Sequence, residues 1–203
     1  MQILAIDVGL LHLALIHVFL ADDYLHRTDI ILEEEILLCD LVDITKLVSN
    51  CNDPNCKLYH DKVICDYIAH LFQKFQQVFD NVDLILIERQ PPVGLVAVEQ
   101  LIMNQYRNKC ILISPTAMLN YFGILHLEYL ERKVHTEKIA MEYLGSIKLF
   151  VFSERRHDMA DACCILLYYL KMKRKDQIQK PRKYDVMTPY KSNLHKYIYQ
   201  ASE

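Results

Sequence analysis

The chain has 203 residues, 52% of them hydrophobic and only 4 of them glycine, which supports one compact domain with an appendage and argues against two full domains. The 7 cysteines are an odd number and no basic segment opens the sequence, so we expect neither a disulfide framework nor a secretory signal, and predict an intracellular, cytoplasmic, reducing location. The apolar run from Leu10 to Leu20 is too short to span a bilayer, so no membrane association is expected.

Charge is unevenly distributed along the chain, although the formal net charge is only -3. The segment from Lys171 to Glu203 has nine Lys and Arg against three acids, a charge of +6, so the rest of the chain carries -9. We therefore predict a folded domain over residues 1–175 and a basic C-terminal extension over residues 176–203. The extension could contact a phosphate backbone, or it could be a solvated tail that aids solubility.

The first part of the chain is typical of strands. Residues 2–9 and 10–20 are apolar runs joined by a tight turn, and residues 30–44 are a third, partly alternating run, so we predict three consecutive antiparallel strands. Residues 49–60 contain Asn, Asp and Pro, which is typical of a loop or a small knuckle. Apolar residues at helical spacing then predict a helix over residues 61–78.

The remainder alternates between strands and helices. The continuous apolar run over residues 82–88 predicts a strand that is covered on both faces. It is followed by a predicted helix over 95–106, a strand over 109–115, a short helix over 116–122, a helix that begins polar over 131–145, and a helix over 159–173. The order is thus three strands, helix, strand, helix, strand and further helices.

Acidic residues occur where the pattern predicts buried strands. Asp7 lies in the first strand, and Glu88 ends the fourth directly before Arg-Gln-Pro-Pro. Because an unpaired buried charge is costly, each acid should be paired or close to a metal. Asp158 and Asp161 are three residues apart and share one face near the start of the last helix. The plainer explanations are a hydrogen-bonded strand acid before a turn and a pair of N-cap or first-turn aspartates.

Considered together, acids from two strands and one helix start match the needs of a two-metal phosphodiester site. Hard carboxylate oxygens favour Mg²⁺, whereas zinc is less suited because no His or Cys accompanies all four acids. In such a site one ion would activate water and the other would stabilise the departing 3′ oxygen.

Four short motifs occur in an order that resembles the RNase H-like Holliday junction resolvases: LAIDVG (4–9), LILIERQPP (84–92), ERK (131–133) and RRHDMADA (155–162). That family includes bacterial RuvC and the pox- and iridovirus-type resolvases, and the ERQPP and RHDMADA forms are most similar to the large DNA virus branch. The resemblance covers about residues 1–175. It implies an α/β RNase H-like nuclease domain whose five-stranded mixed sheet has three antiparallel strands, then two parallel ones, flanked by helices.

The resemblance also implies a function. Members of the family are homodimers that bind branched DNA and nick four-way junctions symmetrically in a Mg²⁺-dependent hydrolysis, with Mn²⁺ as an expected substitute and no small-molecule cofactor. The family's acidic, metal-binding quartet is matched by Asp7, Glu88, Asp158 and Asp161. His157 could assist water or phosphate, or it could be a plain surface residue. A viral source would place the protein in the host cytoplasm or a viral factory.

Several basic and polar residues are candidates for contact with DNA. Lys133, before a predicted helix, matches a basic residue that approaches the scissile phosphate in the family, and Arg132 and Lys138 compete for that role. With Arg89 and Gln90 at the rim of the expected cleft, they are predicted to bind DNA. Alternatively, Lys133 is an ordinary solvated residue and Arg89 pairs with a neighbouring acid.

A second metal site is compatible with the predicted loop. Cys51, Cys56 and His60 have a spacing that suits a structural zinc. A fourth ligand could come from Cys39, Cys65 or His70. The alternative is an ordinary loop with reduced cysteines, because the sequence has no closed four-ligand signature.

Three other functions compete with the resolvase. A sugar kinase or actin-like ATPase shares the RNase H-type core, but needs further glycine-rich phosphate loops and a second copy of that core. A non-catalytic junction-binding protein would have little reason to keep four desolvated acids. Another RNase H-like hydrolase or an exonuclease remains open, because these motifs do not specify the shape of the substrate.

Overall fold

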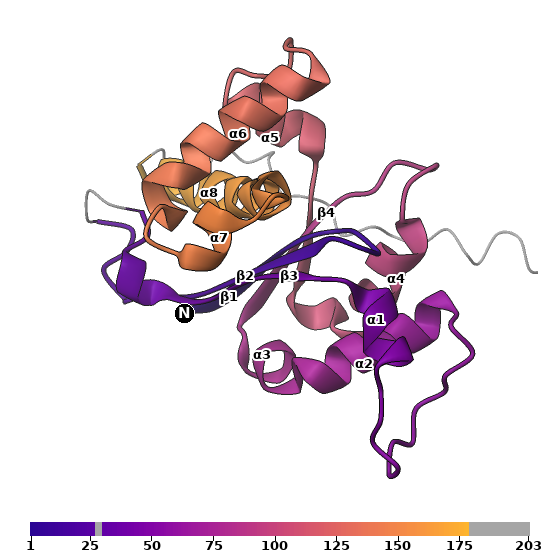
Figure 1. Cartoon of the computed structure of the whole chain (residues 1–203). Helices are drawn as coiled ribbons and strands as arrows, with labels where there is room; N and C mark the ends of the chain where they lie inside the picture. Colours follow the sequence, from indigo (N-terminus) through magenta and orange to yellow (C-terminus); the bar gives the residue numbers. More distant parts are fainter. Residues whose placement is uncertain (27–29, 179–203) are drawn as a thin grey trace, which may run out of the picture.

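A five-stranded mixed sheet forms the centre of the molecule (Figure 1). The structure, a computed structural model, describes residues 1–26 and 30–178. The strands are β1 (Gln2–Asp7), β2 (Leu13–Phe19), β3 (Ile36–Val42), β4 (Leu84–Glu88) and β5 (Cys110–Ile113). In space the order is β3-β2-β1-β4-β5, with β1, β2 and β3 antiparallel and β4 parallel to both β1 and β5. The predicted fold class is confirmed.

Helices cover both faces of the sheet. In Figure 1 the helices α5 to α8 lie on one face and α1 to α4 on the other. Their bounds are α1 (Ile44–Ser49), α2 (Ile64–Lys74), α3 (Gln76–Asn81), α4 (Val96–Gln105), α5 (Pro115–Tyr121), α6 (Tyr129–Leu144), α7 (Lys148–Phe152) and α8 (Arg156–Ile178), with short 3₁₀ helices η1 (Glu33–Glu35) and η2 (Arg107–Lys109).

The central strands are buried on both faces, as their continuous apolar sequence predicts. Ile3 and Ala5 of β1 point into one hydrophobic core with residues of α6 and α8, whereas Leu4 and Ile6 point into a second core with residues of α2 and α4. All four side chains are fully buried. The two cores therefore fix β1 and β4 from both sides, so the carboxyl ends of these strands are rigid supports for any side chain placed there.

The predicted helix over 61–78 is wrong at both ends. Lys62 adopts a left-handed backbone conformation with φ 60°, which a helix cannot contain, so α2 starts only at Ile64. At the other end α2 stops at Lys74, and the chain resumes as the separate helix α3. The predicted strand over 30–44 is also shorter than expected, because its three consecutive glutamates form η1 and only Ile36–Val42 joins the sheet.

The last two long helices both begin earlier than predicted. α6 starts at Tyr129, where the backbone N–H of Glu128 donates to the Glu131 side chain at 3.2 Å, so Lys133 lies within the helix and not before it. α8 starts at Arg156 and continues to Ile178, past the predicted boundary at residue 175; the remainder of the basic extension lies outside the described residues. Among residues 1–26 and 30–178, no helix has both the length and the apolar character needed to cross a membrane.

Candidate active site

Two carboxyl groups lie side by side at the carboxyl edge of the sheet. β1 and β4 are parallel neighbours and pair Ile6 with Ile87, so the next residue of each strand, Asp7 and Glu88, ends its strand at the same level. The negative charge of Glu88 is, after burial, the largest cause that raises the pKa of Asp7. Two neighbouring carboxylates repel each other, so a proton on one of them or a cation beside them would be favourable.

The other two acids come from the start of α8, which packs against β1 and β4. Asp158 is in the first turn of the helix, as the plainer explanation expected, and is 6% exposed. Asp161 lies one turn further along, beyond the reach of a capping role. Both contribute negative charge at Asp7, so the structure brings together all four acids that the sequence singled out.

Burial and mutual repulsion raise the pKa values of the two strand acids. The pKa of Asp7 is well above its ordinary 3.8, first because the side chain is buried and then because Glu88, Asp161 and Asp158 add negative charge. The pKa of Glu88 is raised from 4.5 by burial and then by Asp161, against a lowering by the Gln90 amide and by Lys133. Binding of a cation would relieve this repulsion, which makes the group of acids a candidate cation site.

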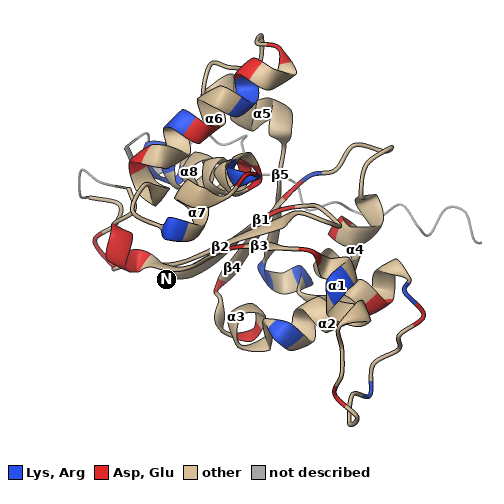
Figure 2. Ribbon diagram, in the orientation of Figure 1, with Lys and Arg blue, Asp and Glu red and all other residues tan. Residues whose placement is uncertain are grey.

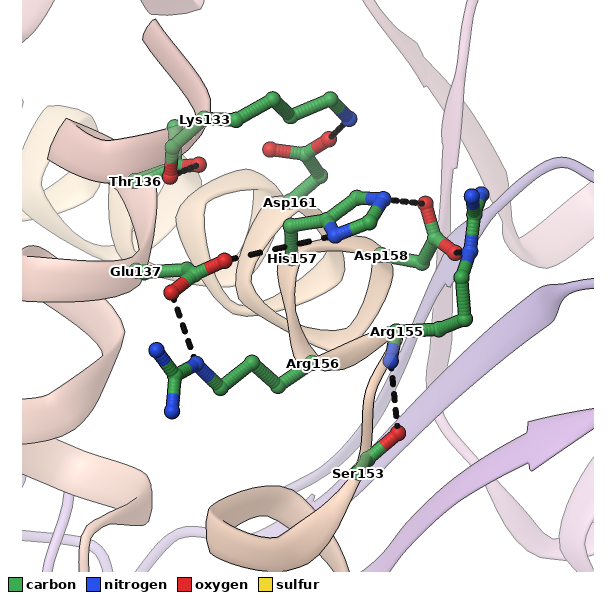
Figure 3. A network of polar contacts seen from close by, with 9 residues as sticks. All are labelled: Lys133, Thr136, Glu137, Ser153, Arg155, Arg156, His157, Asp158 and Asp161. Carbon is green, nitrogen blue, oxygen red and sulfur yellow. Dashed lines mark hydrogen bonds and ion pairs between the residues drawn. The ribbon is translucent and has the colours of Figure 1, made fainter. Parts of the chain in front are cut away.

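Lys133 places a positive charge directly on the quartet (Figure 3). Its ammonium group is ion-paired with Asp161, and both side chains are largely shielded, at 20% and 15% exposed. Burial lowers the pKa of Lys133, but the charge of Asp161 and the hydrogen bond to it outweigh burial, so the pKa is raised overall and the side chain stays cationic. Arg132 lines the same small cavity, of about 170 Å³, while Lys138 is exposed and does not.

Charged side chains near it in the sequence contact Asp158. Figure 3 shows Arg155 and His157 on either side of its carboxylate, with Arg155 Nε at 2.9 Å and His157 Nε2 at 3.3 Å. Glu137 of α6 accepts from Arg156 at 2.7 Å and so joins α6 to the start of α8. The sequence interpretation missed Arg155, Arg156 and Glu137, because an i, i+3 pair and a contact between distant helices look like ordinary surface charge in one dimension. Charged residues gather along α6 and around the start of α8 (Figure 2).

The two residues after Glu88 differ in their surroundings: Gln90 contacts Glu88, and Arg89 is exposed. The Gln90 side-chain amide donates to Glu88 Oε2 at 3.1 Å, and its backbone N–H donates to the buried Glu99 at 2.6 Å. Glu99, which the sequence interpretation missed, thus fixes the turn that holds Gln90 against Glu88. The Arg89 side chain is exposed, as expected of a residue at a rim, and its backbone N–H donates to Ile113 of β5.

The predicted zinc ligands also come together, far from the acids in sequence and on other elements. Cys51, Cys56, His60 and His70 each have a ligand atom within 4.8 Å of the others. Of the three candidates for the fourth ligand, His70 is therefore the one in place. Cys65 is exposed on α2, and Cys39 on β3 contacts Met159 instead, with its Sγ 3.6 Å from the Met159 Sδ.

No protein-family model and no curated protein matches this sequence. Solved structures do match, and they show that the chain has the RNase H-like fold of the fowlpox virus and yeast mitochondrial Holliday junction resolvases. The crystal structure of fowlpox virus resolvase with its substrate Holliday junction DNA is similar at a TM-score of 0.59 and 15% identity, over 85% of this chain and 99% of that one. Yeast mitochondrial Holliday junction resolvase Ydc2 is similar at a TM-score of 0.53 and 17% identity, over 87% of this chain and 86% of that one. The resemblance found in the motifs is thus confirmed at the level of the fold.

The donor set fits a divalent cation of the Mg²⁺ type. All four acids offer hard oxygen atoms, no imidazole or thiol lies among them apart from His157, and the raised pKa values of Asp7 and Glu88 mark the repulsion that a cation would relieve.

We expect the affinity of this site for Mg²⁺ to rise with pH. Because burial and neighbouring acids raise the pKa values of Asp7 and Glu88, a cation must displace protons that free carboxyls would already have lost. The affinity for Mg²⁺ should therefore be weak when the pH equals the ordinary pKa values of these groups, 3.8 and 4.5. It should increase, with release of protons, as the pH passes their raised pKa values. Titration calorimetry in buffers of different ionisation enthalpy measures both quantities. An affinity that is unchanged between pH 5 and pH 8, within about twofold, would contradict this assignment.

Proposed function

We propose that this protein is a structure-selective endonuclease that resolves four-way DNA junctions by Mg²⁺-dependent phosphodiester hydrolysis, as part of the processing of recombination, repair or replication intermediates. One observation carries the proposal: four acids from β1, β4 and α8 converge beside an ion-paired lysine. The fold supports it, because fowlpox virus resolvase, which shares that fold, has been crystallised with its substrate Holliday junction DNA.

The acids and Lys133 have separate tasks in this proposal. Asp7, Glu88, Asp158 and Asp161 hold Mg²⁺, or Mn²⁺ in its place, and the bound ions supply Lewis acidity toward the phosphate and the attacking water. Gln90 keeps the Glu88 carboxylate in position through its amide. Lys133 offers a positive charge beside Asp161 at the cavity where a phosphate would be received. His157 holds one oxygen of Asp158, which orients that carboxylate.

DNA would lie along the basic side chains around this cavity. Arg132 lines the cavity, and Arg89 and Lys138 are exposed on neighbouring elements, so all three are suited to phosphate contacts. The basic C-terminal extension is a further candidate by charge. We expect Arg89→Ala to weaken junction binding and to reduce the dependence of log affinity on log salt by about one phosphate contact, whereas Gln90→Ala reduces cleavage and leaves binding unchanged.

The active form is proposed to be a homodimer in the cytoplasm, or in a viral factory if the protein is viral. A four-way junction presents two equivalent strands for cleavage, and two copies of one site related by a two-fold axis match that symmetry. A single active site would instead produce independent nicks.

The proposal is tested by incubating the purified full chain with a synthetic four-way junction, a linear duplex of the same sequence and a three-way junction, each with and without Mg²⁺. We expect paired nicks at symmetric positions in the four-way junction, made only with the metal ion. Equal cutting of the linear duplex would indicate a general nuclease, and binding to the junction without cutting would indicate the non-catalytic alternative. Cleavage of the RNA strand of a hybrid would favour another RNase H-like hydrolase.

A further inference from the structure

Residues 50–63 form the longest irregular segment between two described helices, and none of them belongs to either hydrophobic core. Residues 50–63 join α1 to α2 without secondary structure, and Figure 1 shows this segment extending away from the sheet. Most of its side chains are exposed, and Tyr59 is 78% exposed. Irregular connections longer than about 12–15 residues are uncommon in compact domains, so a segment of this kind needs some other constraint.

The constraint that the structure offers is a cluster of four metal-binding side chains. Cys51 and Cys56 are half-buried at either end of a turn, His60 is in the loop, and His70 is buried in the second turn of α2. The turn between the cysteines is ordered by its own hydrogen bonds: the Cys56 N–H donates to the Asp53 carbonyl, and the Asn55 N–H donates to the Asp53 side chain at 2.8 Å. Three ligands therefore come from the loop and one from a helix fixed in the protein core.

The distances within the cluster suit a tetrahedral zinc ion. With Zn–N bonds of about 2.0–2.1 Å and Zn–S bonds of about 2.3 Å, tetrahedral angles place two nitrogens about 3.4 Å apart and a nitrogen and a sulfur about 3.6 Å apart. Here His60 Nε2 and His70 Nε2 are 3.2 Å apart, and Cys56 Sγ is 3.8 Å from His70 Nε2. Two cysteines and two histidines are also a ligand set that structural zinc sites use.

The tautomer of His70 is already set for metal binding. Its Nδ1 lies 2.8 Å from the backbone carbonyl of Asp66, an acceptor only, so Nδ1 carries the proton and Nε2 presents its lone pair to the cluster. A hydrogen bond of this kind, from the second ring nitrogen to a carbonyl, is the usual support of a zinc-bound histidine.

We propose that Cys51, Cys56, His60 and His70 bind a structural zinc ion that fastens the loop over residues 50–63 to α2. This site is separate from the carboxylate quartet in chemistry as well as in position: soft thiolate and imidazole ligands select zinc, whereas the carboxylates select Mg²⁺. All four coordination positions are filled by the protein, so the ion has no open place for a substrate and acts on stability alone.

The proposal is tested on the full chain, produced without a histidine tag and purified under reducing conditions without a chelator. We expect about one zinc ion per chain by elemental analysis. Titration of the metal-free, reduced protein with Co²⁺ in excess Mg²⁺ should give the visible absorption of tetrahedral cobalt together with a thiolate-to-cobalt band. Both should be lost in Cys56→Ser and in His70→Gln.

A matched control is available in α2, the helix that contains His70. Cys65→Ser removes an exposed cysteine of α2 that lies outside the cluster, and we expect it to bind one zinc ion and to give the same cobalt spectrum as the unaltered chain. Removal of zinc should lower the midpoint of thermal unfolding of the unaltered chain and of Cys65→Ser, but not of Cys56→Ser. A protein without zinc and without a thiolate-to-cobalt band, or a disulfide between Cys51 and Cys56 under reducing conditions, overturns the proposal.

Discussion

Asp7→Asn is expected to abolish cleavage while making the folded protein more stable. The substitution removes a proposed metal ligand at the carboxyl end of β1, so single-turnover nicking of a four-way junction should fall by on the order of 10³-fold. Binding to the junction should persist, because Asp7 is buried and acts on the metal, not on the phosphate backbone. The loss would therefore appear in the rate of the bound complex and not in affinity.

The gain in stability follows from the sign of the pKa shift. The pKa of Asp7 is raised by burial, so the unfolded chain loses this proton more readily than the folded chain does. Ionisation thus destabilises the fold, beginning above the ordinary value of 3.8 and increasing until the pH passes the raised pKa. In metal-free protein the unfolding midpoint of Asp7→Asn should exceed that of the unaltered chain at pH 7, and the difference should vanish near pH 3.

The matching control for Asp7→Asn is the same comparison in saturating Mg²⁺. The ion stabilises the chain that retains the carboxylate more than it stabilises the variant. The unfolding midpoint of the unaltered chain should therefore rise to that of Asp7→Asn or exceed it. A variant that is less stable than the unaltered chain in metal-free buffer at pH 7 would contradict the view that the quartet is a strained, cation-binding site.

Lys133→Met is expected to reduce single-turnover nicking by about 10²-fold, the usual effect of removing one preorganised charge from such a site. The matched variant is Arg132→Met, on the preceding residue of α6 and lining the same cavity. Because Arg132 is not paired with the quartet, its loss should weaken junction binding several-fold and change the bound-state rate by less than tenfold. This pair also decides between two of the three residues that the sequence left in competition; the third is Lys138.

A merely structural role for Lys133 has a different signature. If its only task were to neutralise Asp161, Lys133→Met together with Asp161→Asn would be no slower than Asp161→Asn alone. If Lys133 contributes to the reacting phosphate, Lys133→Arg should recover part of the rate, and the double variant should be slower than either single one. Equal rates for Arg132→Met and Lys133→Met would remove the special role assigned to Lys133.

The sequence was sufficient to predict the sheet and the acids because both depend on local signals. A continuous apolar run predicts a buried strand, and a charge at its end, as at Glu88, is visible without any coordinates. The same holds for Asp158 and Asp161, whose spacing implies a shared helix face. Helix ends were less predictable: the left-handed Lys62 and the hydrogen bond from the Glu128 N–H to the Glu131 side chain depend on local geometry that propensity does not reveal.

Contacts between distant segments could not be predicted from one sequence. The pairing of Lys133 with Asp161, of Glu137 with Arg156, and of Gln90 with Glu99 each joins different elements, so only the packed structure brings these side chains together. For the same reason the sequence could propose three zinc ligands in one loop but could not choose the fourth. His70 is selected because α2 turns its imidazole back toward the loop.

The acids of the quartet come from both the first strand and the last helix of the described domain, so they are synthesised at different times. Asp7 is made before strands β2 to β5, whereas Asp158 and Asp161 are made only after the last strand of the described sheet, and α8 must then dock across β1 and β4. No fragment that lacks α8 contains all four acids. Under the proposed function, the enzyme would therefore have no activity until its domain is finished, which would protect nucleic acids from partly made enzyme.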